Sequence, residues 1–231
     1  MSRRLILWFA GILALGLIAL IPLRTALGRF ADQGFTARQV AGSIWYGRIG
    51  ELNFKARRLG TFEVTLDPLA MLTGAMKLNF HRLDDPQGVL DGALVSGVSR
   101  GFRDTSGRIG VAGLFGALPV DAIELKDVTV LFKGQGCVRA TGQATVILAS
   151  PLPGVDGVAL RGSPRCEKER VRFVLSTPSQ AGKLDFYVRS SGDYRAWFHV
   201  LGAQPEQAAA LTTAGFTASP EGMMLSVDGR L

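Results

Sequence analysis

The chain has 231 residues, 47% of them hydrophobic, and a formal net charge of +7. The apolar content excludes an intrinsically disordered chain, and the length suffices for one sizeable domain or two small ones with a substantial core. The sequence contains no phosphate-binding loop and no metal-binding motif, so we expect no cofactor.

The first predicted element is a transmembrane helix from Leu5 to Leu23, because residues 5–21 contain no charged side chain. Such a helix would be about 28 Å long, close to the hydrocarbon thickness of a bilayer. The alternative is a cleavable signal peptide that ends at the small-residue pattern Ala26-Leu27-Gly28. We favour a retained helix, because the apolar run is longer than a usual signal-peptide core and Arg24 lies in the cleavage region.

Positive charges flank this apolar run on both sides, with a slight excess before it. Arg3, Arg4 and the terminal amine precede the run, and Arg24 and Arg29 follow it. The excess favours a bacterial inner-membrane protein with residues 1–4 in the cytoplasm and the rest of the chain in the periplasm. Nucleic acid is not an expected partner there. We expect residues 24–40 to connect the helix to a β-rich domain at residues 41–231.

After the apolar run the sequence predicts β-strands, because apolar residues recur at every second position between glycine-rich turns. Long helices of the kind that parallel βαβ units need are missing. The predicted fold is therefore mainly β, with one large, mostly antiparallel sheet that is either curved or doubled. The apolar rows are Phe62, Val64 and Leu66; Met76, Leu78 and Phe80; Val128, Val130 and Phe132; Val171, Phe173 and Leu175; Leu184, Phe186 and Val188; and Leu225 with Val227.

Two short helices interrupt this pattern. Asp67 to Gly74 has a capping aspartate, a proline in the first turn and a glycine at the end, which is the signature of a short helix. Residues 205–211 begin with a proline and contain three consecutive alanines, which indicates a second helix of about two turns.

The two cysteines, Cys137 and Cys166, each lie beside a strand-like row. A disulfide between them is the natural interpretation outside the cytoplasm. Two unrelated buried thiols are the alternative. Metal binding is a poor explanation, because neither cysteine belongs to a C-x-x-C pair and no histidine lies near either of them in the sequence.

One motif associated with catalysis is present. Residues 97–101 match the G-x-S-x-G pattern, but the polar, glycine-punctuated segment that follows has no helical period, and a nucleophile elbow turns from a strand directly into a helix. His81 and His199 both lie in strand-like rows and are expected to be half-buried strand residues. We therefore predict that the protein is not an enzyme.

Several short motifs together resemble the type II secretion system protein N family. Residues 41–49, AGSIWYGRI, are similar to the tryptophan signature of that family, with Gly42, Ser43, Trp45 and Gly47 at the motif positions. The segment around Pro68 resembles the next block of the family, and Leu118-Pro119 resembles its central leucine-proline turn. A second tryptophan of the family is replaced here by the stretch with Phe62 and Val64.

The resemblance implies an accessory inner-membrane component of the type II protein secretion machinery, without chemistry of its own. It implies contacts with other inner-membrane components of that system, and the outer-membrane secretin and membrane lipid are further candidate partners. Added strands at an open sheet edge are the expected mode of contact. The predicted sheet also resembles AsmA-like β-groove proteins, so lipid binding or transfer is the alternative function. We expect Trp45 to be a core anchor rather than a binding residue.

Overall fold

The computed structural model describes residues 20–27, 35–54, 57–84 and 88–230, and in addition residues 8, 9, 11, 13 and 16. Within these parts of the chain, no helix has the length and hydrophobicity that a membrane crossing requires. Most of the predicted transmembrane helix from Leu5 to Leu23 lies outside the described residues, so this helix stays a prediction.

A single 14-stranded sheet dominates the structure, and its strands follow one another in chain order except at the last position, where β14 lies between β12 and β13. Every pairing is antiparallel. The prediction of a mainly β, antiparallel fold is confirmed. The strands are β1 Phe35–Gly42, β2 Gly47–Phe54, β3 Arg57–Leu66, β4 Ala75–Asp84, β5 Leu90–Gly97, β6 Arg100–Gly110, β7 Val120–Lys133, β8 Gly136–Leu148, β9 Ala159–Glu167, β10 Arg170–Ser176, β11 Gly182–Arg189, β12 Asp193–Leu201, β13 Thr217–Ser219 and β14 Gly222–Arg230.

The described helices are short, and both predicted ones are confirmed. Helix α3 (Pro68–Leu72) joins β3 to β4, and the Asp67 carboxylate caps it by accepting hydrogen bonds from the backbone N–H groups of Leu69 and Ala70. Helix α4 (Pro205–Thr213) joins β12 to β13. A further short helix, α2 (Leu23–Leu27), precedes the sheet.

The sheet begins earlier than the sequence suggested, because β1 includes residues 35–40, which we expected to form a connector. The expectation missed these residues because Thr36, Ala37, Arg38 and Gln39 are all exposed, so the strand lacks the alternation of apolar and polar side chains that marks a half-buried strand.

Near the centre of the sheet, the ladder between β6 and β7 is irregular. Its register shifts twice, and Asp104 and Asp127 at these shifts have φ values of 49° and 51°. Thr129 fixes one shift, since its hydroxyl oxygen accepts a hydrogen bond of 2.9 Å from the Asp104 N–H and the hydroxyl donates one of 3.1 Å to the Asp104 carboxylate. Such bulges bend a strand and increase its twist.

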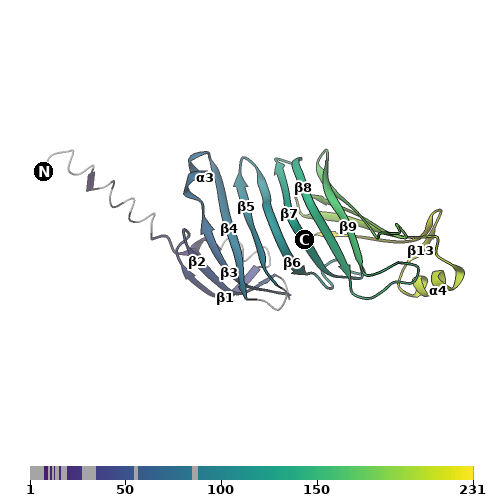
Figure 1. Ribbon diagram of the computed structural model, residues 1–231. Helices are drawn as coiled ribbons and strands as arrows, with labels where there is room; N and C mark the ends of the chain where they lie inside the picture. The colour runs from purple at the N-terminus through teal and green to yellow at the C-terminus, as the bar shows by residue number, and fades with distance from the viewer. Residues whose placement is uncertain are drawn as a thin grey trace.

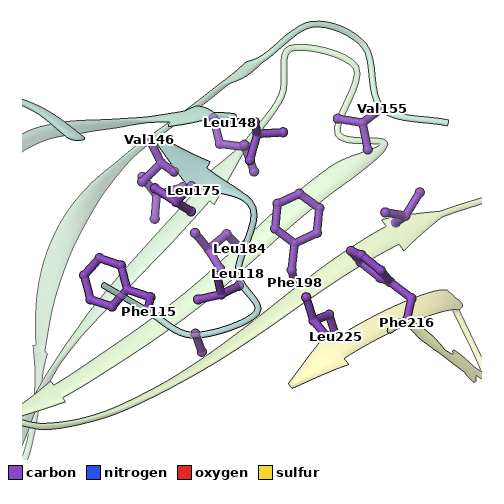
Figure 2. Close-up of a cluster of buried hydrophobic side chains, with 14 of the residues drawn as sticks. Phe115, Leu118, Val146, Leu148, Val155, Leu175, Leu184, Phe198, Phe216 and Leu225 are labelled. Atoms are coloured by element: carbon purple, nitrogen blue, oxygen red, sulfur yellow. The ribbon is translucent and has the colours of Figure 1, made fainter. Parts of the chain in front are cut away.

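The C-terminal half of the sheet closes around the main hydrophobic core. Figure 1 shows the strands after β9 curving back toward the connection between β6 and β7. Residues 111–119 of that connection insert into the concave side, where Phe115 and Leu118 are buried among side chains of β8 to β14 (Figure 2). The Phe115 ring contacts the rings of Phe186 and Tyr194 edge to face, at centroid distances of 5.4 and 5.3 Å.

The N-terminal half buries much less. Among the described residues, its cluster of buried apolar side chains has five members, Leu23, Ile49, Phe62, Val64 and Leu90, compared with nineteen in the C-terminal core. Ile109 packs against both clusters, so one apolar face, here called the inner face, continues across the whole sheet. This face is closed over β8 to β14 and more open over β3 to β6.

Candidate interaction surfaces

Both edges of the sheet are candidates for pairing with another chain. Strand β1 pairs with β2 along one side, and no described strand pairs with its other side. Just beyond the end of β1, Ser43 forms an isolated bridge with Pro22, and the short helix α2 contacts β1. At the opposite edge, β13 pairs with only Gly222 to Met224 of β14, so residues 225–230 extend beyond it. An uncovered strand presents backbone N–H and C=O groups to an incoming strand.

A second candidate surface is the open part of the inner face. Leu78 packs on the N-terminal cluster and lies opposite Leu94, which lies opposite Phe102, so these side chains share one face. Met76 is on the same face of β4 as Leu78. Met76 and Leu94 are 52% and 51% exposed, which leaves a strip of apolar surface accessible.

The tryptophan motif forms the turn between β1 and β2. The Ser43 hydroxyl accepts hydrogen bonds from the N–H groups of Trp45 and Tyr46, and Gly42 has a φ of 88°, which favours glycine. Gly47 is covered by Leu23, because a Cβ at this position would lie 2.5 Å from the Leu23 Cδ2 atom. Trp45 itself is half-buried in the turn and is not a member of the buried clusters.

The other motif residues also have structural positions. Pro68 begins α3, and Leu118 is buried in the C-terminal core. Pro119 is half-buried, and its carbonyl oxygen accepts a hydrogen bond of 2.9 Å from the Ala149 N–H. The motif residues therefore hold turns at separate places and do not converge on one site.

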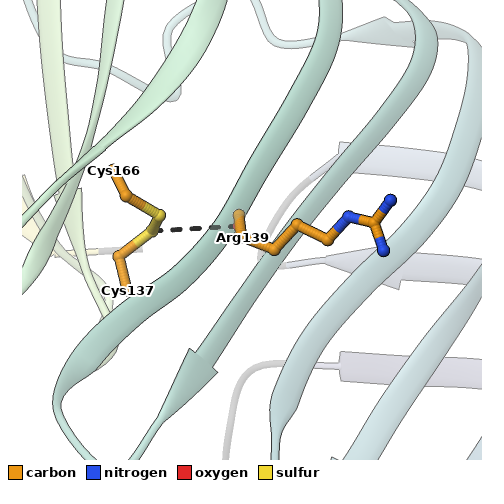
Figure 3. Close-up of a disulfide and its surroundings, with 3 residues drawn as sticks. All are labelled: Cys137, Arg139 and Cys166. Carbon is orange, nitrogen blue, oxygen red and sulfur yellow. Dashed lines mark hydrogen bonds between the residues drawn. A yellow bond between two sulfur atoms is a disulfide. The ribbon is translucent and has the colours of Figure 1, made fainter.

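The predicted disulfide between Cys137 and Cys166 is present, and it joins the start of β8 to the end of β9 with a Cα–Cα distance of 5.4 Å (Figure 3). The ladder between these strands covers only Ala144 to Ile147 on the β8 side. The disulfide therefore connects the two strands at a point where the ladder does not. The Cys137 N–H also donates a hydrogen bond of 2.9 Å to the Lys168 carbonyl.

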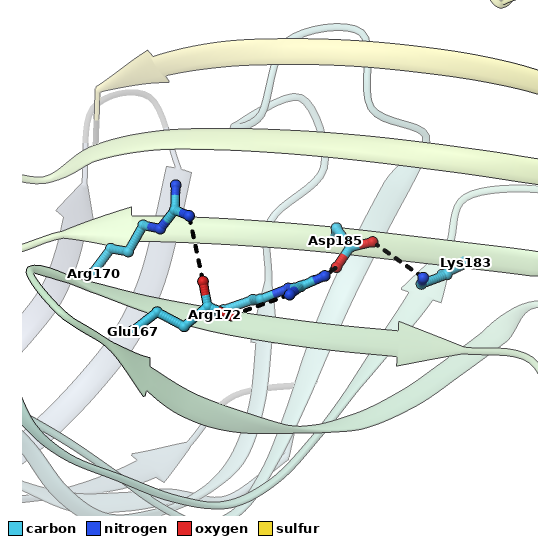
Figure 4. A network of polar contacts seen from close by, with 5 residues as sticks. All are labelled: Glu167, Arg170, Arg172, Lys183 and Asp185. Carbon is cyan, nitrogen blue, oxygen red and sulfur yellow. Dashed lines mark hydrogen bonds and ion pairs between the residues drawn. The ribbon is translucent and has the colours of Figure 1, made fainter. Parts of the chain in front are cut away.

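A charged network covers the outer face of β9 to β11 (Figure 4). The Arg172 guanidinium donates hydrogen bonds to the Asp185 carboxylate, at 3.0 and 2.7 Å, and to Glu167 at 3.1 Å. These hydrogen bonds raise the pKa of Arg172 above its ordinary value. Arg170 lies over the Tyr187 ring, 4.2 Å from its centroid, and Tyr187 contacts Trp197 edge to face.

We expect Arg172→Met to reduce the free energy of unfolding by about 2 kcal/mol, because it removes the main partners of a carboxylate that is only 10% exposed. Arg170→Met is the matched control on the same strand, and since its ion pair with Glu167 is more exposed, the loss should stay below about 1 kcal/mol. Urea unfolding of both variants checks the difference, and equal losses would contradict it.

The free energy of unfolding should depend on pH through Asp156. The carboxylate of this residue accepts hydrogen bonds from the Ser179 hydroxyl and N–H group. The Ser179 hydroxyl is the largest cause of a pKa below the ordinary aspartate value. A lowered folded-state pKa adds stability above the unfolded pKa, and this stability is lost as the pH falls through the folded pKa. NMR titration should show the Asp156 pKa rising toward its ordinary value in Ser179→Ala, and an unchanged pKa would contradict this cause.

The G-x-S-x-G motif lies in a hairpin. Val98 and Ser99 form the turn between β5 and β6, so a strand rather than a helix follows the serine, and the architecture of a nucleophile elbow is missing at this position. The expectation of a half-buried His81 is wrong, because His81 is exposed on β4, where it pairs with the Asp91 carboxylate on β5. His199 is half-buried on β12, as expected. Over the described ranges, no group of residues could hold a metal ion.

Comparison with known proteins decides the family. The sequence model of type II secretion system protein N matches residues 33–224, from just before β1 into β14. The chain belongs to the type II secretion system protein N family. Neither the curated proteins nor the solved structures gave a significant match.

Membership in the protein N family confirms the resemblance seen in the short motifs and makes the chain a component of the type II secretion machinery. The family is not known for an enzymatic activity, and its members imply other secretion components as partners. The matched range covers β1 to β13 and thus one open edge of the sheet completely.

Sequence reasoning missed one notable side chain of this protein N sheet. Arg82 is buried on the inner face, where it lies over the Phe62 ring, 5.4 Å from the ring centroid. Its guanidinium donates hydrogen bonds to the carbonyl oxygens of Gly88 and Arg108, at 3.2 and 2.9 Å, and so links the start of β5 to β6. The sequence signal for its burial was the alternation in β4, because Arg82 follows Leu78 and Phe80 at every second position.

Proposed function

We propose that the protein is an accessory inner-membrane component of the type II secretion machinery, anchored by residues 5–23, whose periplasmic sheet binds another component of the system. The family match supports the machinery, and the uncharged run at residues 5–21 supports the anchor. Inner-membrane components of the system are the proposed partners, with the outer-membrane secretin as a further candidate.

The observation that carries the proposed mode of contact is the outer edge of β1, with which no described strand pairs. This strand has eight residues, and Arg38 is its only charged side chain, so little discourages an added strand. It is also the first strand after the anchor region, which would keep the edge close to partners in the same membrane. The partner would add a strand through main-chain hydrogen bonds.

Proline substitutions in β1 test this contact. Neighbouring residues in a strand point their N–H groups to opposite sides of the strand. Of the two variants Arg38→Pro and Gln39→Pro, one therefore removes an N–H group that points away from β2, and the other removes an N–H group that faces β2. The outward variant is the one whose unfolding temperature stays closer to that of the unsubstituted protein. We expect this variant to lose the crosslinked secretion component from detergent extracts, as identified by mass spectrometry.

The matched control is alanine at the same position, which keeps the N–H group and should keep the partner. If the outward proline variant retains the partner, the β1 edge is not the binding surface. If no secretion component copurifies with the unsubstituted protein either, the proposal of a scaffold fails as a whole.

The exposed strip on the inner face favours a second candidate, a groove for lipid acyl chains. The strip is restricted to β4 and β5 and their neighbours, since the face is closed over β8 to β14. The same mass spectrometry distinguishes the two functions. Stoichiometric lipid that is lost in Leu94→Lys, in the absence of a protein partner, would favour the groove.

A further inference from the structure

Three connections lie at the same end of the sheet as the N-terminal segment. Gly47 at the start of β2 pairs with Val64 near the end of β3, so the β1–β2 turn and α3 are at one end. Ala75 at the start of β4 pairs with Gly97 at the end of β5, which places the β5–β6 hairpin at that end too. We call this end, with the turn at residues 43–46, α3 and the hairpin at residues 98–99, the α3 end.

Large apolar side chains are exposed at the α3 end. Helix α3 has no buried residue, and its Leu69 and Leu72 are 72% and 84% exposed. Met71 of the same helix, Val98 of the hairpin and Tyr46 of the turn are exposed as well. The other connecting helix, α4, differs, because its Leu211 is completely buried in the C-terminal core. Packing against the described part of the chain therefore does not explain why α3 carries so many large apolar side chains.

The chain arrives at this end directly from its uncharged segment. The Ile44 N–H donates a hydrogen bond of 3.1 Å to the Ile21 carbonyl, Pro22 and Ser43 form a bridge, and Leu23 is buried over Gly47. Helix α3 follows β3, the strand next to β2, so at the spacing of sheet strands it lies on the order of 10 Å from this junction. If residues 5–23 cross a bilayer, this distance places α3 close to the bilayer surface at which the chain leaves the membrane.

The charges of the same end suit an anionic surface. Arg24 is exposed next to the junction, and Arg100 and Lys133 lie at adjoining ends of β6 and β7. The Arg100 guanidinium donates to the Gly134 carbonyl, which holds it at this end. The acidic Asp67 is occupied as the cap of α3 and by an ion pair with Lys77. Basic side chains beside exposed apolar ones are typical of an interfacial membrane contact.

We propose that the α3 end lies against the bilayer, with the side chains of Leu69 and Leu72 inserted at the boundary between headgroups and acyl chains. The occupant of this surface is phospholipid of the membrane that holds the anchor, so the inference rests on the proposed anchoring by residues 5–23. The contact would fix the orientation of the sheet above the membrane and set the direction of its β1 edge.

Photo-crosslinking from three positions tests this contact in the full-length protein, reconstituted in vesicles of phosphatidylethanolamine and phosphatidylglycerol. A photoreactive phenylalanine analogue is placed at Leu72 for the α3 end, at Trp8 for the anchor, and at Val89 as the control. Val89 is also an exposed apolar residue, and it precedes β5 at the opposite end of the sheet. Mass spectrometry then measures lipid adducts at each position.

We expect lipid adducts at Trp8 and at Leu72, several-fold above those at Val89. Adducts at Trp8 with none above the Val89 level at Leu72 would overturn the contact and leave the anchor in place. Equal adducts at all three positions would overturn it too, since the whole domain would then meet lipid. If no lipid adduct forms at Trp8, both the anchor and the contact are overturned. If the analogue at Leu72 instead crosslinks to a second copy of the chain, the α3 end is a dimer interface and not a lipid contact.

Discussion

Replacing both Cys137 and Cys166 by serine should lower the free energy of unfolding by about 3.6 kcal/mol, because the disulfide closes a loop with a sequence separation of 29 residues. The consequence should also be local. Since the β8–β9 ladder stops at Ala144, the start of β8 would lose its covalent link to β9 and exchange its amide protons faster.

Urea unfolding and hydrogen exchange of the detergent-solubilised protein measure these two effects. The control is reduction, because a reducing agent should bring the unsubstituted protein to the stability of the double-serine variant and leave the variant itself unchanged. Equal stability of the oxidised protein and the variant would show that the disulfide does not contribute to the fold in this way.

The second large effect is expected for Phe115→Ala, at about 3–5 kcal/mol of unfolding free energy. Phe115 is buried and comes from a connection rather than from a strand, so its removal leaves a cavity beside the stacked rings of Phe186 and Tyr194. The closed C-terminal half of the sheet would lose the side chain that joins residues 111–119 to β11 and β12.

Phe102→Ala is the matched control, because Phe102 is only half-buried, at the margin of a small buried cluster that includes Val128 and Val130. Its loss should be clearly smaller, since the side chain already contacts solvent and leaves no closed cavity. Thermal and urea unfolding of both variants provide the comparison, and a larger loss for Phe102→Ala would contradict the assignment of the main core to the C-terminal half.

Sequence patterns predicted the elements whose signals are local. The alternation of Phe62 with Val64 and of Val128 with Val130 gave strands whose apolar side chains are indeed buried. The cap at Asp67 and the proline at position 205 marked α3 and α4 correctly. The tryptophan motif pointed to the family that the sequence comparison then confirmed.

Features that depend on contacts between distant parts of the chain were not predictable in this way. Phe115 lies in a connection between strands, where no alternation of apolar and polar residues predicts that it is buried among residues of β11 and β12. The choice between a curved and a doubled sheet stayed open, because the bulges at Asp104 and Asp127 are visible only in the paired strands. The proposed interaction site at the edge of β1 has no sequence motif, because an added strand would bind through backbone N–H and C=O groups, which every residue except proline carries.

The strand order also has a consequence for how the chain folds as it is synthesised. Because strands β2 to β12 each pair with the strand just before them, every new strand can dock as soon as it emerges, without waiting for distant sequence. Residues 111–119 are the exception, because Phe115 of this connection packs on Phe186 of β11 and Tyr194 of β12, which come much later in the chain. A chain arrested after β8 should thus protect its first strands from protease while Phe115 is still exposed, and closure of the C-terminal half would be the last step of maturation.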